Sequence, residues 1–362
     1  MQRTGTADLP LHGGRAPRWL FDRMVRLAGA ILEAIVVELG PQEVLRRLQD
    51  PFWFQAFGAL LGFDWHSSGL TTTTTGAIKE ALKDRDLGLY VAGGKGRTSR
   101  KTPDQIRRIA DRTGIHPDPL IYASRMTAKV DSAALQDGYQ IYHHVLIFTQ
   151  DGQWVVIQQG MNPVRRYARR YHWSSEHLQS FVVEPHTGIA AQRRESRVLD
   201  LTAKESVATQ EVMVDLVRER PEQTIRDMER LRHLRLPRRH ELWVQDLRPE
   251  SLKKILLRTY ERAPASFEEL LGLQGVGPKT IRALALVSDI IYGATPSYQD
   301  PAVYAFAHGG KDGYPYPVNR RVYGRSIDVV ERAIRLAKLG HREKLQALRK
   351  LGQLFSDEEV SS

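Results

Sequence analysis

The sequence predicts an α+β fold, with a mixed N-terminal domain that contains a small antiparallel sheet and an all-α C-terminal domain. Two β-rich runs, 142–149 and 154–159, flank the turn signal Asp151-Gly152, which is typical of a β-hairpin. After residue 196 the apolar residues recur at helical spacing, with charged residues between them. A polar segment at 192–195 separates the two patterns, so we predict domains at 1–195 and 196–362.

The other N-terminal elements follow from local signals. Apolar periodicity between Pro17 and Gly40 predicts one helix, and Pro41 to Gly62 predicts a second helical stretch. A helix is expected from Gly76, directly after the threonines at 71–75. The hydroxyls and amides of these threonines could bind an anion ahead of the helix N-terminus, or the threonines could form a strand or cap the helix. Weak strands are expected at 87–92 and 181–184, and a helix begins at Thr102.

Prolines divide the C-terminal half into helices. We expect them at 201–218, 222–234 and 249–261, followed by a helix-hairpin-helix at 267–293 and terminal helices at 327–339 and 344–355.

The composition limits the possible functions. The chain has 362 residues, 41% of them hydrophobic, and a formal net charge of +11, which is typical of a protein that binds nucleic acid. It contains no cysteine, which excludes disulfides, thiolate metal sites and a cysteine nucleophile. This fits a cytosolic protein, and it also fits one from a hot environment, where thermolabile residues are scarce. No apolar run reaches the ~18 residues of a membrane span. We expect a cytoplasmic, nucleoid-associated protein; its oligomeric state stays open.

The most informative stretch is the predicted hairpin. Ser266 and Glu269 form a capping-box pattern before a short helix, and Pro278 suits the first position of the next helix. Gly275 and Gly277 flank Val276, and glycine permits a tight turn with exposed amides. Lys279 and Thr280 follow in the first helical turn, so amides and a cation together suit a phosphodiester.

The string Leu273-Gln-Gly-Val-Gly-Pro-Lys-Thr280 resembles the helix-hairpin-helix of DNA-repair proteins, most closely that of the endonuclease III-like glycosylases. In that group the lysine two residues after the second glycine is the nucleophile, a position held here by Lys279. The resemblance implies a glycosylase, with or without lyase activity, that acts on a damaged base flipped out of duplex DNA and needs no metal or organic cofactor. A lysine that only contacts phosphate is the equal alternative.

The resemblance also implies a catalytic aspartate further along the chain. The best match to its Pro-Val-Asp string is Tyr316-Pro-Val-Asn319-Arg320, which has an amide that cannot accept a proton as a carboxylate does. Asp300 or Asp312 would supply the carboxylate, or the chain is a non-catalytic relative, or this copy carries an Asp→Asn change at position 319.

Over nearly its whole length the chain is similar to a prokaryotic family catalogued as domain of unknown function 763. The similarity lies in GTADLPLHGG from Gly5, DGYQIYHH from Asp137 and HGGKDG from His308. The resemblance implies an aspartate in the Pro-Val-x-Arg string, so Asn319 departs from the family pattern.

Further DNA contacts are expected outside the hairpin. Cations alternate with aromatics at 165–173, which suits a nucleic-acid backbone and its bases, and the expected contacts there are Arg165, Arg166, Arg169 and Arg170. A glycine-rich basic loop adds Lys95 and Arg97, the N-terminal arm adds His12, and Arg320 lies near the C-terminus. The loop lacks the spacing of a nucleotide-triphosphate site.

Two other functions stay open. Asp131, Asp137 and His144 could serve a metal-dependent nuclease, although the second strand of the hairpin lacks the acidic residue and lysine usual in such enzymes. The chain could also be a DNA-structure binder without catalysis. Magnesium dependence separates the nuclease from the lyase, and salt-sensitive binding without a product identifies the binder.

Overall fold

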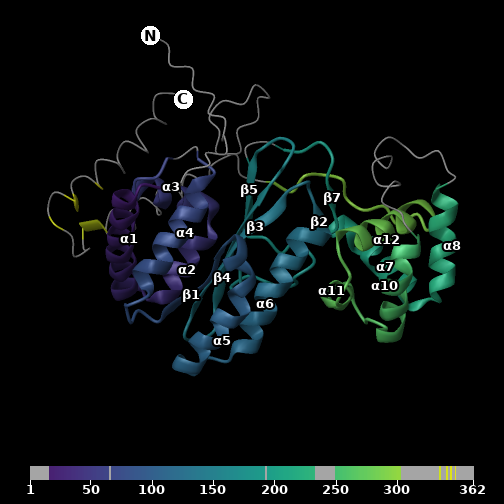
Figure 1. Cartoon of the computed structure of the whole chain (residues 1–362), viewed down its shortest axis with the longest axis horizontal. Helices are drawn as coiled ribbons and strands as arrows, with labels where there is room; N and C mark the ends of the chain where they lie inside the picture. The colour runs from purple at the N-terminus through teal and green to yellow at the C-terminus, as the bar shows by residue number, and fades with distance from the viewer. Residues whose placement is uncertain are drawn as a thin grey trace, which may run out of the picture.

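The structure, a computed structural model, describes residues 16–64, 67–191, 194–232 and 249–302, with the single residues 334, 335, 340, 343, 344 and 347. Its centre is a five-stranded antiparallel sheet in the order β1-β3-β4-β5-β6 (Figure 1). The strands are β1 (Leu89–Lys95), β3 (Gln140–Thr149), β4 (Trp154–Met161), β5 (Ala168–Ser174) and β6 (Gly188–Ala191). A two-stranded sheet pairs β2 (Leu135–Gln136) with β7 (Leu199–Asp200). The predicted α+β fold is confirmed.

The β-hairpin predicted around Asp151-Gly152 is present as β3 and β4. Phe148 lies opposite Trp154, and Gly152 has a φ of 84°, which a glycine adopts without steric cost. Side chains alternate between the two faces, so Val145 and Ile147 belong to one core while Leu146 and Phe148 belong to the other. Both faces of the sheet are therefore covered.

Helices from the N-terminal part cover the first face: α1 (Arg18–Leu39), α2 (Pro41–Gln49), α3 (Pro51–Leu60) and α4 (Gly69–Leu82). The second face carries α5 (Thr102–Thr113) and α6 (Pro117–Lys129), and the short 3-10 turn η1 (Gly96–Lys101) joins β1 to α5. A π-helical turn, η2 (Val130–Ala134), joins α6 to β2. The result is a helix–sheet–helix sandwich.

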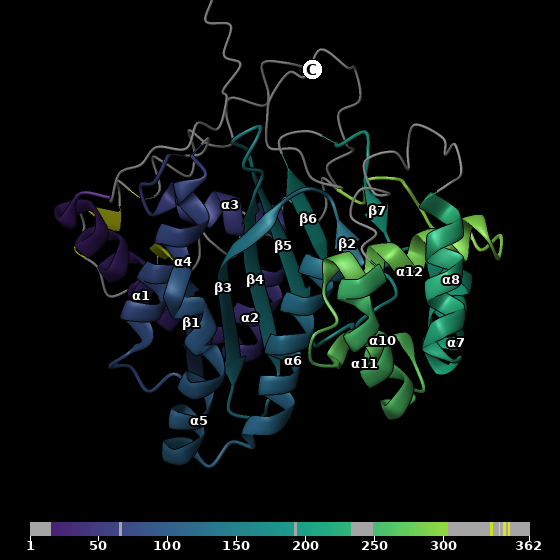
Figure 2. The same cartoon turned by 45° about the vertical axis from the view of Figure 1, so that its right-hand side comes forward.

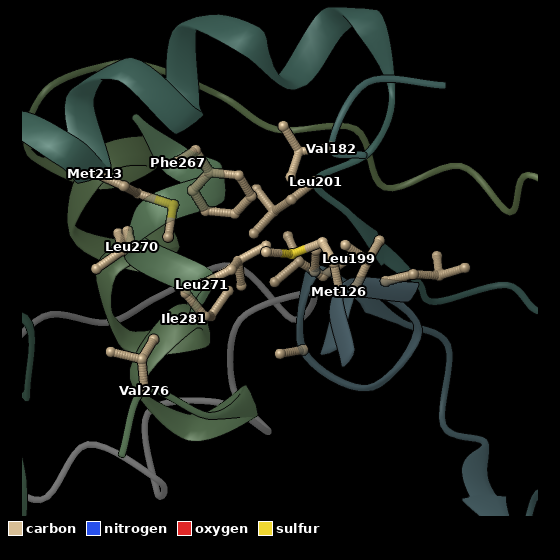
Figure 3. Close-up of a cluster of buried hydrophobic side chains, with 14 of the residues drawn as sticks. Met126, Val182, Leu199, Leu201, Met213, Phe267, Leu270, Leu271, Val276 and Ile281 are labelled. Atoms are coloured by element: carbon tan, nitrogen blue, oxygen red, sulfur yellow. The ribbon is translucent and has the colours of Figure 1, made fainter. Parts of the chain in front are cut away.

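The helices of residues 204–290 gather beside α6 and the β2–β7 sheet (Figure 2). They are η3 (Lys204–Ser206), α7 (Val207–Arg218), α8 (Pro221–Arg232), α10 (Pro249–Arg262), α11 (Phe267–Gly272) and α12 (Pro278–Ile290). Phe267, Leu271 and Val276 share one core with Met126 and Leu199, as Figure 3 shows. This core crosses the predicted boundary at residue 195.

The helical stretch expected at 41–62 is present as two helices, because the Asp50 carboxylate accepts hydrogen bonds from the amides of Phe52 and Trp53 and so begins α3. Two other local expectations were wrong. The threonines at 71–75 lie inside α4 instead of ahead of a helix, and Thr75 Oγ1 donates to the Thr71 carbonyl within it. Residues 181–184 form bends instead of a strand.

The terminal helices expected at 327–339 and 344–355 fall almost wholly outside the described residues. Of the helices within the described part, none combines the length and apolar character that crossing a bilayer requires.

Candidate functional site

The segment 267–290 folds as two helices joined by a tight turn, and we call it the hairpin. Ser266 Oγ accepts a hydrogen bond from the Glu269 amide, and Glu269 Oε2 accepts one from the Ala265 amide, so the start of α11 is capped from both sides. The turn between the helices is closed by the Val276 amide, which donates to the Leu273 carbonyl. Apolar side chains of both helices point inward to the shared core (Figure 3).

The tip of the hairpin faces solvent on one side. Val276 is buried, while Gly275, Pro278 and Lys279 are exposed. Gly275 has a φ of 93°, a conformation that strongly favours glycine. Gly277 is different, because its φ is −137° and a Cβ there would meet nothing within 4 Å. The fold itself therefore does not require glycine at position 277, and the open space beside its amide admits an external group.

Backbone amides at this tip are available as donors. Within the described residues, no acceptor takes a hydrogen bond from the Gly275 or Gly277 amide. The Lys279 amide lies in the first turn of α12, where a helix leaves its N–H groups without intrahelical partners. Their partial positive charge adds to that of the helix N-terminus and attracts an anion.

Two cationic side chains lie at the tip. Lys279 is exposed in the first turn of α12. Arg258 is exposed on α10, and its Nη1 is 3.9 Å from the position a Cβ of Gly275 would take. Sequence reasoning missed Arg258, because the residues around a cation on the outer face of a helix do not indicate which distant turn it will lie beside.

Two side chains of the N-terminal part contact the hairpin backbone. Lys129 Nζ donates to the Val276 carbonyl, and burial lowers the pKa of this lysine. Gln136 Nε2 donates to the Pro278 carbonyl at 2.9 Å, and Arg282 Nε donates to Gln136 Oε1 at 2.7 Å. Sequence reasoning did not connect these residues with the hairpin, because the contacts span well over a hundred residues of chain.

Asp300, one of two carboxylates expected to serve Lys279, is held in an internal ion pair. Arg169 Nη1 donates to its Oδ1 at 3.0 Å and Nη2 to its Oδ2 at 2.6 Å. The Ala302 amide also donates to Oδ1 and the Glu195 amide to Oδ2, so each oxygen accepts two hydrogen bonds. Asp300 has a structural role here, and catalysis by it would require breaking this pair. The other carboxylate candidate, Asp312, lies outside the described residues, as do Asn319, Arg320 and His12.

The structure corrects the prediction of a DNA-binding basic strip at 165–173, because most of this segment is buried. Residues 168–174 form the wholly buried strand β5. Arg169 also bonds Asp137, and Arg170 donates to Gln55 Oε1 and to the Pro51 carbonyl, so neither arginine faces a ligand outside the protein. Burial lowers the pKa of Arg170 to about 9, although the charge of Asp50 acts in the opposite direction. The sequence pattern was misleading because the acceptors for these cations come from distant segments.

The remaining predicted cations lie at the surface. Arg165 and Arg166 are exposed in the β4–β5 loop, where Arg165 pairs with Glu195. Lys95 and Arg97 are exposed at the end of β1, and Lys95 Nζ lies 5.8 Å from the centre of the Tyr142 ring. These four residues are accessible to a polyanion.

The residues considered for a metal-dependent nuclease form a buried hydrogen-bond network instead. Asp131 Oδ2 accepts hydrogen bonds from Trp173 Nε1, at 2.9 Å, and from Gln158 Nε2. The other amide atom of Gln158, Oε1, lies 2.9 Å from His144 Nδ1. Asp137 accepts from Tyr171 and Arg169. Burial raises the pKa of Asp137 and lowers that of His144, because it disfavours the charged form of each. Among the described residues, no group of three or more acidic or histidine side chains could hold a metal ion.

Comparison with known proteins gives one match. The model of a family described as "Protein of unknown function (DUF763)" matches residues 5–318. Neither a curated protein nor a solved structure matches the chain.

Proposed function

The chain belongs to the DUF763 family, and from its hairpin we propose that it binds the phosphodiester backbone of DNA at the tip formed by residues 275–280. The observation that carries this proposal is Gly277, which is a glycine although neither its backbone conformation nor its neighbours require one. A glycine in such a place is explained if a bulky group approaches the backbone closely.

The chemistry of the tip favours a phosphate over other anions. Free amides at 275 and 277 and the first turn of α12 can donate to two oxygens of one phosphodiester, as helix N-termini do in many phosphate sites. Lys279 and Arg258 add charge beside the amides, and a formal net charge of +11 supports long-range attraction of a polyanion. The tip offers amides and cations, which contact phosphates, so binding should show little sequence preference.

The first experiment measures the affinity of the full chain for a fluorescent duplex by anisotropy. Gly277→Ala places a methyl group in the space assigned to the phosphate and should weaken binding about tenfold, the loss expected for one charge-assisted hydrogen bond. Gly272→Ala is the matched control, because Gly272 is exposed at the end of α11 and its Cβ would make only an ordinary contact with Met126. Equal affinities for the two variants would refute the proposal.

A second function, glycosylase or lyase activity, is favoured by the position of Lys279. Its side chain is exposed in the first turn of α12, beside the amides that would hold the phosphate. The amine would attack C1′ of a damaged nucleoside, the C1′–N bond would break with the base leaving as it takes up a proton, and opening of the sugar would give a Schiff base.

Borohydride trapping tests this second function. The wild-type chain and an Asn319→Asp variant are incubated in chelator with duplexes that carry damaged bases, and borohydride reduces any Schiff base to a stable adduct. A covalent band that disappears with Lys279→Ala supports the lyase. Binding without a band from either protein leaves DNA binding as the function.

A further inference from the structure

We infer that Lys129 and Gln136 are positioning residues that polarise the hairpin amides for phosphate, each acting through the peptide unit whose carbonyl it contacts. The inference rests on the proposed function. Both side chains come from the part of the chain that carries the sheet, and neither is assigned to phosphate contact itself.

The argument begins with which peptide each side chain touches. The Val276 carbonyl, which accepts from Lys129 Nζ, belongs to the peptide unit that contains the Gly277 amide. The Pro278 carbonyl, which accepts from Gln136 Nε2 at 2.9 Å, belongs to the unit that contains the Lys279 amide. These two amides are donors that the proposed phosphate site would use.

A hydrogen bond to a peptide carbonyl draws electron density toward its oxygen, which makes the N–H of the same unit a stronger donor. Hydrogen bonds in a chain strengthen one another by roughly 10–30% each in condensed phase. The cationic Lys129 has the larger effect because a charged donor forms a stronger hydrogen bond than a neutral one.

The orientation of Gln136 is fixed by its own partners. Its Nε2 also donates to the Ala133 carbonyl at 2.8 Å, and its Oε1 accepts from Arg282 Nε at 2.7 Å. Arg282 therefore holds the amide group with its nitrogen toward the Pro278 carbonyl. The three side chains together fix the Val276 and Pro278 carbonyls before any ligand arrives.

The first test needs no DNA. In amide NMR spectra of the isotopically labelled full chain, Lys129→Met should move the Gly277 amide proton upfield while the Gly275 signal changes little. Gln136→Leu should move the Lys279 amide proton and leave that of Gly277 nearly unchanged. If the signals of Gly277 and Lys279 do not respond in this paired manner, the inference fails, whether or not the protein binds DNA.

The second test separates positioning from direct contact. Lys129→Met should weaken duplex binding about two- to fivefold, because the Gly277 amide is then no longer strengthened as a donor by the hydrogen bond at the Val276 carbonyl. The slope of log affinity against log salt should stay at its wild-type value, because no phosphate contact is lost. A slope reduced by about 0.9, the value for one phosphate contact, would overturn the inference by showing that Lys129 binds DNA itself.

The conservative variant Lys129→Arg keeps the charge and the donor, so it should restore the affinity and the Gly277 signal toward wild-type values. If Lys129→Arg behaves like Lys129→Met, the inference is refuted. A wild-type chain that does not bind DNA would refute the proposed function, and the amide shifts would still decide between polarised and ordinary peptide units.

Discussion

Replacing Asp300 with asparagine should destabilise the protein by about 3–5 kcal/mol, the usual cost of removing one partner from a buried ion pair. The Asp300 side chain is 2% exposed and that of Arg169 is 0% exposed. Arg169 would keep Asp137 as a carboxylate partner, but its Nε already lies buried without an acceptor.

The hydrogen bonds explain the size of this effect. Asp300 accepts four of them, two at each oxygen, and asparagine offers one oxygen. An NH₂ group would replace the other oxygen and point its hydrogens at two donors. Each buried donor left without an acceptor costs about 1–3 kcal/mol, and the lost charge on Asp300 adds to this.

Equilibrium unfolding in urea, followed by tryptophan fluorescence, measures the loss. The matched control is Lys204→Gln, which breaks the ion pair with Glu184, where the two side chains are 71% and 53% exposed; exposed pairs contribute about 0–1 kcal/mol. If Asp300→Asn unfolds at the wild-type urea concentration, the structural role assigned to Asp300 is wrong. Loss of borohydride trapping at unchanged stability would restore the catalytic role.

Three further predictions concern the hairpin and one buried histidine. Lys279→Met should reduce the salt slope of duplex binding by about 0.9, whereas Lys204→Met, which removes the same charge elsewhere, should leave the slope unchanged. Ser266→Ala should lower the free energy of unfolding by about 1 kcal/mol because α11 loses its cap, and an unchanged urea midpoint would contradict this. Burial lowers the pKa of His143 from 6.5 to about 3, so below pH 6.5 the unfolded chain takes up a proton that the folded chain does not, and stability falls as the pH falls toward 3. In urea titrations at several pH values, His143→Asn should reduce the fall in the free energy of unfolding by up to about 1.4 kcal/mol per pH unit. The same dependence of this free energy on pH in both proteins would count against the reasoning.

Elements defined by short-range signals could be predicted from the sequence. The Asp151-Gly152 turn fixes β3 and β4, and Ser266, Gly275 and Pro278 fix the ends of α11 and α12. Each of these signals acts within a few residues through backbone conformation or capping, so it can be read without knowledge of the tertiary structure.

The positions of charged side chains could not be predicted in the same way. Arg169 and Arg170 follow a pattern typical of an exposed basic strip, yet both are buried in β5, because their acceptors, such as Asp300 and Gln55, are more than a hundred residues away in the sequence. The contact of Lys129 with the Val276 carbonyl was missed for the same reason. Only the tertiary fold brings such partners together.

The core shared by α6, β7 and the hairpin has a mechanical consequence. A fragment that begins at residue 196 would expose Phe267, Leu271 and Ile281 to water, at about 1.5–3 kcal/mol for each side chain, so it should aggregate or unfold. In the intact chain the buried side chains of the hairpin hold it against α6 and β7, so a load applied at the tip passes to the part of the protein that carries the sheet.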